Sequence, residues 1–297
     1  MKLNGIITPI ITIMTDKGEI DYKNMKLHIN NLIENGINGL LFLGSIGEFY
    51  SFNKEKKKEL IDFAVKEVDG RVPVLVGVGD TNLNDVMDMS TYCKNKGVDV
   101  LVLISPYYFA PTEDSTFDYM SYVAKNMDLP LLLYNFPARS GNDLVPDLVY
   151  KLAKENKNII GIKDTVDNIS HTRKLINKVK KDFPEFLIFS GFDEYYLSNR
   201  VSGGDGLISG LTNVEPKIFS ELHRAYQEKD FDTLTDYGNR ISKLMEIYDI
   251  ADLFITGIKA GVKINGLDIS TYTNSPSKPI TQKQFEEIKN IINDSSV

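Results

Sequence analysis

The chain has 297 residues, of which 42% are hydrophobic and 25% are charged, a composition typical of a globular protein rather than a disordered one. Its 34 Lys and Arg residues are outnumbered by 41 Asp and Glu residues, and the net charge of −7 argues against binding to nucleic acid or an anionic membrane. No run approaches the roughly 18 apolar residues of a membrane span. One cysteine, Cys93, allows no internal disulfide and no thiolate-rich metal site, and three histidines do not favour metal catalysis. We expect a cytoplasmic protein without a metal.

Short runs rich in Ile, Val and Leu recur along the chain. They are apolar at successive positions, which is typical of parallel strands covered by helices on both faces. The eight runs cover residues 5–13, 39–44, 72–79, 100–105, 130–135, 158–163, 186–191 and 206–210.

Helical patterns lie between these runs, and three of them open at residues suited to an N-cap, namely Asp21, Asn53 and Asn82. Others are expected at residues 113–127, 144–156, 168–181 and 215–228. Strands that alternate with helices at intervals of roughly 30 residues predict a (β/α)8 TIM barrel rather than an open doubly wound sheet.

Three more helical patterns follow the last predicted strand, at residues 231–248, 253–264 and 282–293. No Pro-rich or Ser-rich linker precedes them. We therefore expect a single domain, with the barrel at residues 1–225 and a C-terminal three-helix extension at residues 226–297.

Lys163 is the first candidate functional residue, because it ends the predicted strand 158–163. Active sites of such barrels lie at the C-terminal ends of the strands. Burial disfavours a charged lysine, so a buried lysine is either paired or kept neutral, and a neutral amine is a nucleophile. The alternative is a structural ion pair with Asp164 or Glu48. The tyrosines and the glycine-containing loop at other strand ends favour the nucleophile.

Tyr134 ends the preceding predicted strand, where a phenol can transfer protons; the alternative is a core aromatic. The segment 44–47, Gly-Ser-Ile-Gly, offers backbone N–H groups and a hydroxyl that suit a carboxylate, although it can also be an ordinary turn. It lacks the Walker pattern, and the Gly-Val-Gly segment at 77–79 lacks the third glycine of the dinucleotide fingerprint. A nucleotide cofactor is therefore not predicted.

Polar residues follow two other strand ends. Arg139 can form paired hydrogen bonds with a substrate carboxylate, or it can be a solvated surface residue. Asp193 and Glu194 can accept hydrogen bonds from substrate hydroxyls, or they can be acids in the first turn of a helix.

Three segments carry a resemblance to a known family: Gly-Ser-Ile-Gly-Glu at 44–48, Tyr-Asn-Phe-Pro at 134–137 with Gly141, and Gly-Ile-Lys at 161–163. In their order and spacing they resemble the dihydrodipicolinate synthase/N-acetylneuraminate lyase superfamily. These are class I aldolases built on (β/α)8 barrels with a C-terminal helical region. The resemblance extends over nearly the whole chain, from Gly-Ile-Ile-Thr-Pro at 5–9 to the final helices.

The resemblance implies that Lys163 forms an imine with the keto carbon of pyruvate, without a cofactor. It also implies that Tyr134 shuttles protons and that Ser45 and Tyr108 complete a hydroxyl relay. In the family the tyrosine equivalent to Tyr108 crosses a tight dimer interface, and dimers pair into tetramers, so we expect a homotetramer. The residues implied to contact the small-molecule 2-keto acid substrate are Gly44, Ile46, Gly47, Arg139, Thr165, Asp193, Glu194 and Ile208.

Within the superfamily, the segments 133–137, 160–165 and 203–206 are most similar to bacterial 2-keto-3-deoxygluconate aldolases. We therefore expect reversible cleavage of a 2-keto-3-deoxy sugar acid to pyruvate and an aldehyde.

Other reactions remain open. Dihydrodipicolinate synthases have two threonines where this chain has Ser45 and Ile46, yet Arg139 occupies the position at which they bind the carboxylate of aspartate semialdehyde. The alternatives are therefore a 4-hydroxy-tetrahydrodipicolinate synthase, an N-acetylneuraminate lyase, a dehydratase or decarboxylase using the same imine, and a barrel that senses 2-keto acids without turnover.

Overall fold

The computed structural model describes residues 3–294 and shows a closed barrel of eight parallel strands. The strands follow one another around the barrel in chain order, and the eighth closes it by pairing with the first. The predicted (β/α)8 barrel is therefore confirmed. The strands are β1 (Gly5–Pro9), β2 (Gly39–Phe42), β3 (Val74–Gly77), β4 (Val100–Ile104), β5 (Leu131–Asn135), β6 (Ile159–Asp164), β7 (Leu187–Ser190) and β8 (Gly206–Ile208).

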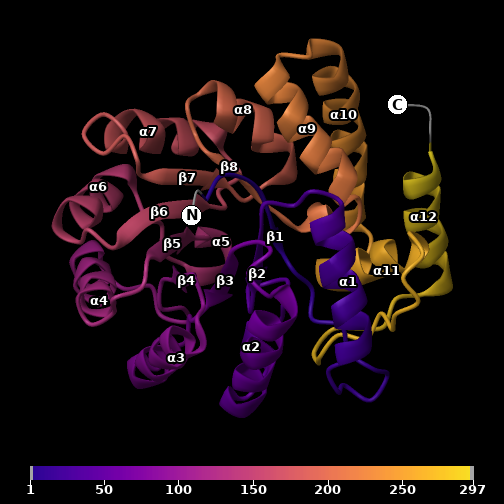
Figure 1. The fold of residues 1–297 in the computed structure, drawn as a ribbon, viewed down its shortest axis with the longest axis horizontal. Coiled ribbons are helices and arrows are strands. Elements are labelled where there is room, and N and C mark those ends of the chain that lie inside the picture. Colours follow the sequence, from indigo (N-terminus) through magenta and orange to yellow (C-terminus); the bar gives the residue numbers. More distant parts are fainter. Residues whose placement is uncertain (1–2, 295–297) are drawn as a thin grey trace.

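Helices surround the barrel, as Figure 1 shows. Eight of them alternate with the strands, and a ninth, α5, is a single short turn after β5. These helices are α1 (Tyr22–Glu34), α2 (Lys54–Val68), α3 (Leu83–Lys96), α4 (Glu113–Lys125), α5 (Pro137–Ser140), α6 (Pro146–Glu155), α7 (Ile169–Val179), α8 (Tyr196–Val201) and α9 (Pro216–Glu228).

The predicted helix starts are confirmed by their capping hydrogen bonds. Side-chain oxygens of Asp21, Asn53 and Asn82 accept from the backbone N–H groups of residues 24, 56 and 84. Each bond satisfies one of the N–H groups that the first turn of a helix leaves without a partner.

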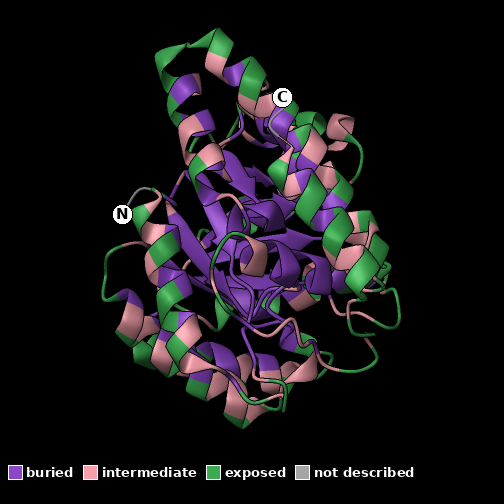
Figure 2. Cartoon of the chain, turned by 90° about the vertical axis from the view of Figure 1, so that its right-hand side faces the viewer, coloured by how far each residue is buried: buried purple, intermediate pink, exposed green. Residues whose placement is uncertain are grey.

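Burial on both faces explains why the strands are continuously apolar. Every residue of β2, β4 and β5 is buried. Figure 2 shows the barrel as the buried centre of the molecule, enclosed by helices whose outer faces are exposed. The strand runs therefore mark the interior, whereas the amphipathic segments mark the surrounding layer.

The C-terminal extension consists of α10 (Phe231–Leu244), α11 (Phe254–Ile264) and α12 (Gln282–Asn293), which lie along one side of the barrel in Figure 1. A 3-10 turn, η4 (Met245–Asp249), connects α10 to the segment before α11. Helix α9 continues to residue 228, so the predicted boundary after residue 225 falls within its last turn. Within residues 3–294, no helix combines the length and the apolar character needed to cross a bilayer.

The structure differs from the prediction at the end of the first strand. The run 5–13 is rich in Ile and buried throughout, but β1 ends at Pro9. Beyond it, the N–H of Ile11 donates to Oδ1 of Asn213 at 3.1 Å instead of to a neighbouring strand. The residues stay buried after the ladder ends, so hydrophobicity alone overestimates the strand.

Candidate active site

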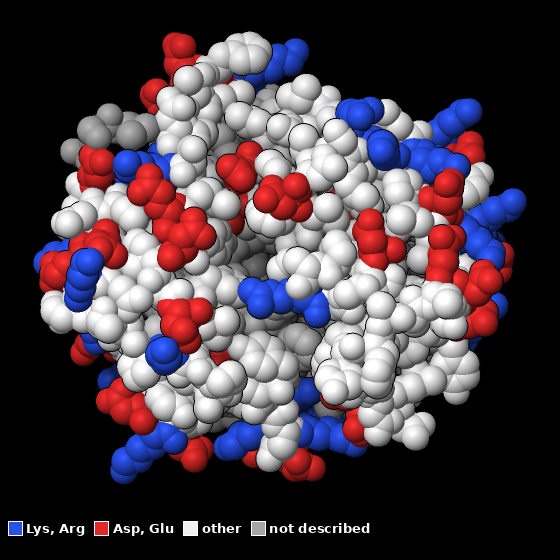
Figure 3. Space-filling view, turned by 180° about the vertical axis from the view of Figure 1, so that it is seen from behind, with Lys and Arg blue, Asp and Glu red and all other residues white. Residues whose placement is uncertain are grey.

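A cavity of about 500 Å³ lies at the C-terminal ends of the strands and extends to η4 and α11. Figure 3 looks at the side opposite to that of Figure 1 and shows a hollow bordered by acidic side chains on one side and basic ones on another. Nine of the predicted site residues line the cavity: Ser45, Ile46, Tyr134, Arg139, Lys163, Thr165, Asp193, Glu194 and Ile208.

Lys163 is positioned by an irregularity in the barrel. The pairing of β5 with β6 shifts by one residue between Leu131 and Leu132, after which Lys163 lies opposite Tyr134. Such bulges re-aim the side chains that follow them. The Lys163 side chain is 5% exposed, and its Nζ lies 4.4 Å from the centroid of the Tyr134 ring. Within residues 3–294 this amine has no carboxylate within ion-pairing distance.

The two acids that could have paired with Lys163 are held elsewhere. Oδ2 of Asp164 accepts from the Thr172 hydroxyl at 2.7 Å and lies 3.0 Å from Nδ1 of His171, while Oδ1 accepts from an amide nitrogen at 3.0 Å. Glu48 is bound by Lys259, whose Nζ lies 2.6 Å from Oε1 of Glu48. The structural ion pair of Lys163 with Asp164 or Glu48 is therefore absent.

His171 contributes to this arrangement because it lies between two carboxylates. Its Nε2 is 3.3 Å from Asp143, and its Nδ1 contacts Asp164. Burial alone would lower the pKa of His171, but the hydrogen bonds and charges of Asp143 and Asp164 raise it to about 9. At neutral pH His171 is therefore a cation that engages Asp164, the neighbour of Lys163 in the strand.

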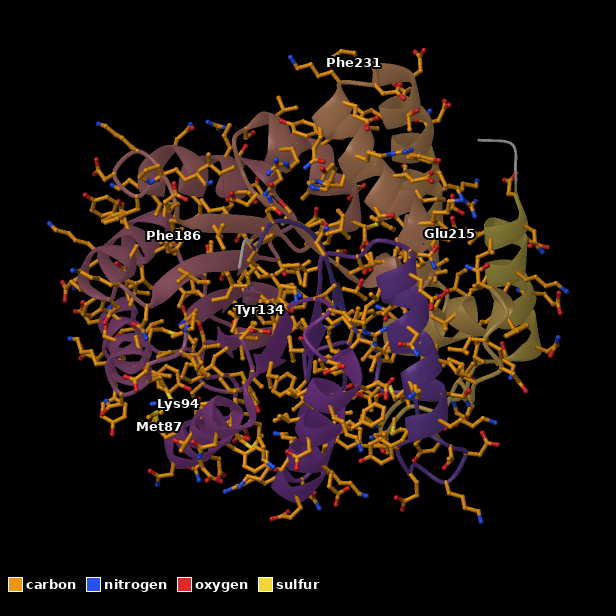
Figure 4. All side chains as sticks on the ribbon, viewed as in Figure 1. Met87, Lys94, Tyr134, Phe186, Glu215 and Phe231 are labelled. Atoms are coloured by element: carbon orange, nitrogen blue, oxygen red, sulfur yellow. The ribbon has the colours of Figure 1, made fainter. Side chains whose placement is uncertain are left out.

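Tyr134 and Ser45 are in contact. The Tyr134 hydroxyl is 3.2 Å from Oγ of Ser45, and Tyr134 is 5% exposed. Figure 4 shows Tyr134 near the middle of the barrel, in contrast to Phe231 at the tip of the extension. The Lys163 amine lies over the Tyr134 ring, so this pair of hydroxyls can carry a proton between the neighbourhood of the amine and Ser45.

The loop 44–47 has free hydrogen-bond donors. For the part of the chain that the structure describes, the backbone N–H groups of Ser45, Ile46 and Gly47 donate to no protein acceptor. A Cβ at Gly47 would lie 3.1 Å from the carbonyl oxygen of Ile10, which keeps this position small. Gly44 and Gly47 themselves do not line the cavity. The loop can therefore present N–H groups to a small anion.

Arg139 reaches the mouth of the cavity from α5. Its guanidinium carbon lies 5.8 Å from the ring centroid of Phe136 and 5.7 Å from that of Phe254. Among residues 3–294 it forms no ion pair. Sequence reasoning left its position open between the site and the surface; the structure places it at the site's edge.

Asp193 and Glu194 differ in accessibility. Asp193 is 1% exposed and accepts hydrogen bonds from the N–H of Leu211 at 3.0 Å and from the hydroxyl of Tyr248 at 2.7 Å. Burial raises the pKa of Asp193 to about 6, although these hydrogen bonds act in the opposite direction. Glu194 is exposed and lines the cavity. Asp193 therefore supports the wall, while Glu194 is open to a ligand.

Thr165 and Tyr108, both predicted to belong to the site, differ in where they lie. Oγ1 of Thr165 is buried and has no hydrogen-bond partner among the described residues, and Gly191 makes room for it, since a Cβ there would lie 1.9 Å away. Tyr108, in contrast, is 87% exposed and does not line the cavity. Within one chain, the proposed relay therefore contains Ser45 and Tyr134 only.

The C-terminal extension supplies a wall that sequence reasoning missed. The residues of this wall lie more than 70 positions after Lys163 and carry no motif, so only the folded chain shows their proximity. No group of three or more His, Cys, Asp and Glu side chains in residues 3–294 is arranged to hold a metal ion. The cavity-lining residues of the extension are Ser242, Met245, Glu246, Tyr248, Asp249 and Phe254.

A parallel barrel whose mouth holds a buried, unpaired lysine beside a phenol defines a class of enzyme that bonds covalently to a carbonyl substrate through an amine. The family model described as "Dihydrodipicolinate synthetase family" matches residues 2–295. The chain therefore belongs to the dihydrodipicolinate synthetase family and is a pyruvate-dependent lyase or aldolase of that family.

Individual relatives agree with this assignment. The Escherichia coli K12 protein YagE, provisionally named a 2-dehydro-3-deoxy-D-gluconate aldolase, is 36% identical over 97% of this chain and 95% of its own. YjhH of the same organism, provisionally named a 2-dehydro-3-deoxy-D-pentonate aldolase, is also 36% identical. The alignment covers 97% of this chain and 95% of YjhH.

Solved structures give the same result. The crystal structure of YagE in complex with pyruvate superposes with a TM-score of 0.96 at 36% identity, covering 98% of both chains. Dihydrodipicolinate synthase from Thermotoga maritima gives a TM-score of 0.93 at 27% identity, covering 99% of both chains.

Proposed function

We propose that the chain cleaves a 2-keto-3-deoxy sugar acid, such as 2-keto-3-deoxygluconate, reversibly to pyruvate and an aldehyde. The observation that carries this proposal is the buried Lys163 amine, which has no acidic partner among residues 3–294 and lies against the ring of Tyr134. The names of YagE and YjhH, both sugar-acid aldolases, support the choice of substrate class.

Lys163 forms the covalent bond to the substrate. Its neutral amine attacks C2 of the keto acid, and the resulting carbinolamine loses water to give a protonated imine. The C3–C4 bond then breaks, and its electron pair moves into the iminium to form an enamine, which is far more stable than a free carbanion. Protonation of the enamine at C3 and hydrolysis release pyruvate and regenerate the amine.

Tyr134 handles the protons of these steps. Tyr134 first gives its hydroxyl proton to the water that leaves the carbinolamine. Cleavage then requires that the C4 hydroxyl lose its proton as the aldehyde forms, and the Tyr134 oxygen accepts that proton. The Ser45 hydroxyl, 3.2 Å away, can pass the proton onward. The substrate carboxylate binds the free N–H groups of the loop 44–47, which place C2 near Lys163.

Tyr108 completes this relay in the proposal only if a second copy of the chain supplies it. Tyr108 and Phe109 are 87% and 80% exposed, and their rings contact each other. A second cavity of about 450 Å³ adjoins Ser45 and is lined mostly by apolar residues, including Phe49 and Tyr107. A partner's Tyr108 in this second cavity would reach the Ser45 hydroxyl. The homotetramer and the cytoplasmic location stay predictions.

The direct test is a coupled assay of pyruvate release from 2-keto-3-deoxygluconate. The wild-type protein is expected to release pyruvate, and the Lys163→Ala variant is expected to release none. Release that persists in the variant, or is missing in the wild type, would contradict the proposal.

Arg139 favours one second candidate, a synthase that condenses pyruvate with aspartate semialdehyde. Its guanidinium lies at the mouth of the cavity, forms no ion pair with the part of the chain that the structure describes, and can bind a distal carboxylate. The structural similarity to dihydrodipicolinate synthase from Thermotoga maritima fits this reaction too. Consumption of pyruvate with aspartate semialdehyde, lost in Arg139→Ala, would favour the synthase over the aldolase.

A further inference from the structure

We propose that the buried pair of Glu48 and Lys259 positions the loop 44–47 and thereby sets how tightly this loop binds the carboxylate of a 2-keto acid. The role of the pair rests on the proposed function, because that function makes the loop the carboxylate site. Neither Glu48 nor Lys259 lines the main cavity, so both are positioning residues that act through the loop. The pair couples ligand affinity to the docking of α11 against the barrel.

Hydrogen bonds to its carbonyl groups fix the backbone of the loop. The N–H of Glu48 donates to the carbonyl oxygen of Ser45 at 3.1 Å, and the Thr12 hydroxyl donates to that of Gly47 at 2.8 Å. Glu48 closes the turn with a φ of 57°, in the left-handed region that residues other than Gly adopt mainly where their surroundings hold them. The geometry of the loop therefore depends on what holds Glu48.

Two groups of the C-terminal extension hold the Glu48 side chain. Nζ of Lys259 lies 2.6 Å from Oε1, and the N–H of Asn274 donates to Oε2 at 2.9 Å. Lys259 is fixed in turn, because its Nζ also donates to the carbonyl oxygen of Tyr272 at 2.6 Å. Both carboxylate oxygens of Glu48 are therefore bound by the extension, and the turn cannot rotate without breaking these bonds.

Stability alone does not account for an ion pair at this place. The side chains of Glu48 and Lys259 are both 0% exposed, and taking two charges out of water is so costly that an apolar pair of similar volume is often at least as stable. The ion pair adds a fixed direction, because each bond holds the turn in one geometry. Donors held in place before the ligand arrives lose less conformational freedom on binding, so the loop binds an anion more tightly.

The test measures imine formation at Lys163 with two ligands, pyruvate and its uncharged amide, pyruvamide. Borohydride reduction traps each imine, and the ligand concentration that gives half-maximal trapping is determined. Only pyruvate carries a carboxylate, so a displaced loop weakens the binding of pyruvate alone, whereas a general distortion of the site weakens both. The half-maximal concentration does not depend on the fraction of folded protein, which separates positioning from stability.

Three double variants are compared with the wild type. Glu48→Ala/Lys259→Met removes both bonds without leaving a buried charge. Glu48→Gln/Lys259→Met is milder, because the Gln side chain can still accept from the N–H of Asn274. Glu215→Ala/Arg240→Met is the matched control, since it removes a second, largely buried ion pair whose members do not line the main cavity.

Glu48→Ala/Lys259→Met should raise the half-maximal concentration of pyruvate by about tenfold or more, and the milder variant should raise it by about threefold. The control should leave it unchanged, and the value for pyruvamide should stay the same in all three variants. A value for pyruvate that is unchanged in the milder variant, or an equal rise for both ligands, overturns the positioning role. A wild-type protein that forms no imine with pyruvate would instead overturn the proposed function.

Discussion

Lys163 and Lys259 are both buried, yet their surroundings differ completely. Lys259 in α11 is fully buried, lies 2.6 Å from Glu48 and donates to the carbonyl of Tyr272 at 2.6 Å. Lys163, in β6, has its Nζ 4.4 Å from the centroid of the Tyr134 ring. Burial alone therefore does not identify a candidate nucleophile. What distinguishes Lys163 from Lys259 is that no carboxylate of residues 3–294 lies within ion-pairing distance of its amine.

The two lysines also differ in what they connect. Glu48 follows the loop 44–47, and its Oε2 accepts from the N–H of Asn274 at 2.9 Å. Burial pulls the pKa of Lys259 below its usual value, against the effect of the Glu48 charge. The pair joins the loop 44–47 to the C-terminal extension, so in our proposal Lys259 stabilises the fold around the site, while Lys163 performs the chemistry.

The same substitution at both positions gives the largest contrast. Lys163→Met is expected to reduce turnover by at least roughly 10⁴-fold, because the nucleophile is lost, while the free energy of unfolding stays the same or rises. Turnover assays and urea unfolding measure the two effects. A Lys163→Met protein that keeps turnover would contradict the assignment.

Lys259→Met should show the opposite pattern. Removing the cation leaves the Glu48 carboxylate buried without its partner, which costs about 3–5 kcal/mol of unfolding free energy. Pyruvate trapping at Lys163 should survive in whatever fraction of the protein remains folded. An unfolding midpoint equal to that of the wild type would show that the pair contributes little.

Tyr134→Phe separates imine formation from proton transfer. Turnover should fall by roughly 10²–10⁴-fold, whereas slow imine formation with pyruvate continues, because the amine is intact. Ser45→Ala is the companion variant, since it removes the hydroxyl in contact with Tyr134. If Tyr134→Phe has normal turnover, another group must move the proton.

A double variant that removes both charges of the Glu48–Lys259 pair separates the cost of an unpaired buried charge from the cost of lost packing. Glu48→Gln/Lys259→Met removes the uncompensated charge, and the Gln side chain can still accept from the N–H of Asn274. We expect recovery of about half of the stability lost in Lys259→Met. A double variant no more stable than Lys259→Met would mean that packing, and not charge, explains the loss.

The smallest expected effect concerns His171. Its folded-state pKa of about 9 exceeds the ordinary value of 6.5, so its stabilisation is complete below pH 6.5 and is lost as the pH rises through 9. His171→Gln should lower the unfolding free energy by about 1–3 kcal/mol at pH 6 and by much less at pH 10. Urea midpoints across this range measure the difference, and a constant difference would refute the charged state of His171.

The sequence predicted the barrel and the strand-end residues for one physical reason. Parallel strands bury both faces, so they can be recognised in the sequence as apolar runs. Their carboxyl ends meet at one side of the barrel, which predicts where the functional residues gather. Lys163, Tyr134 and Ser45 were found in this way. The short helix α5 was missed because a turn of four residues has too little periodicity to detect, and a helix near α8 was expected only as the alternative role of Asp193 and Glu194.

The contributions of the extension could not be predicted. Glu48 and Lys259 are 211 positions apart, and Asp193 and Tyr248 are 55 apart, so neither pair leaves a local pattern. Only tertiary packing brings them together. Tyr108 differs, because the family resemblance implied that it crosses a dimer interface, and in our proposal a second copy explains its exposed ring within one chain.

The most direct test of the central claim is reduction with borohydride in the presence of pyruvate, followed by peptide mass spectrometry. One experiment measures the modification of both Lys163 and Lys259. The account predicts one reduced pyruvoyl group on the peptide that contains Lys163 and none on the peptide that contains Lys259. An unmodified Lys163, or modification at Lys259 instead, would contradict it.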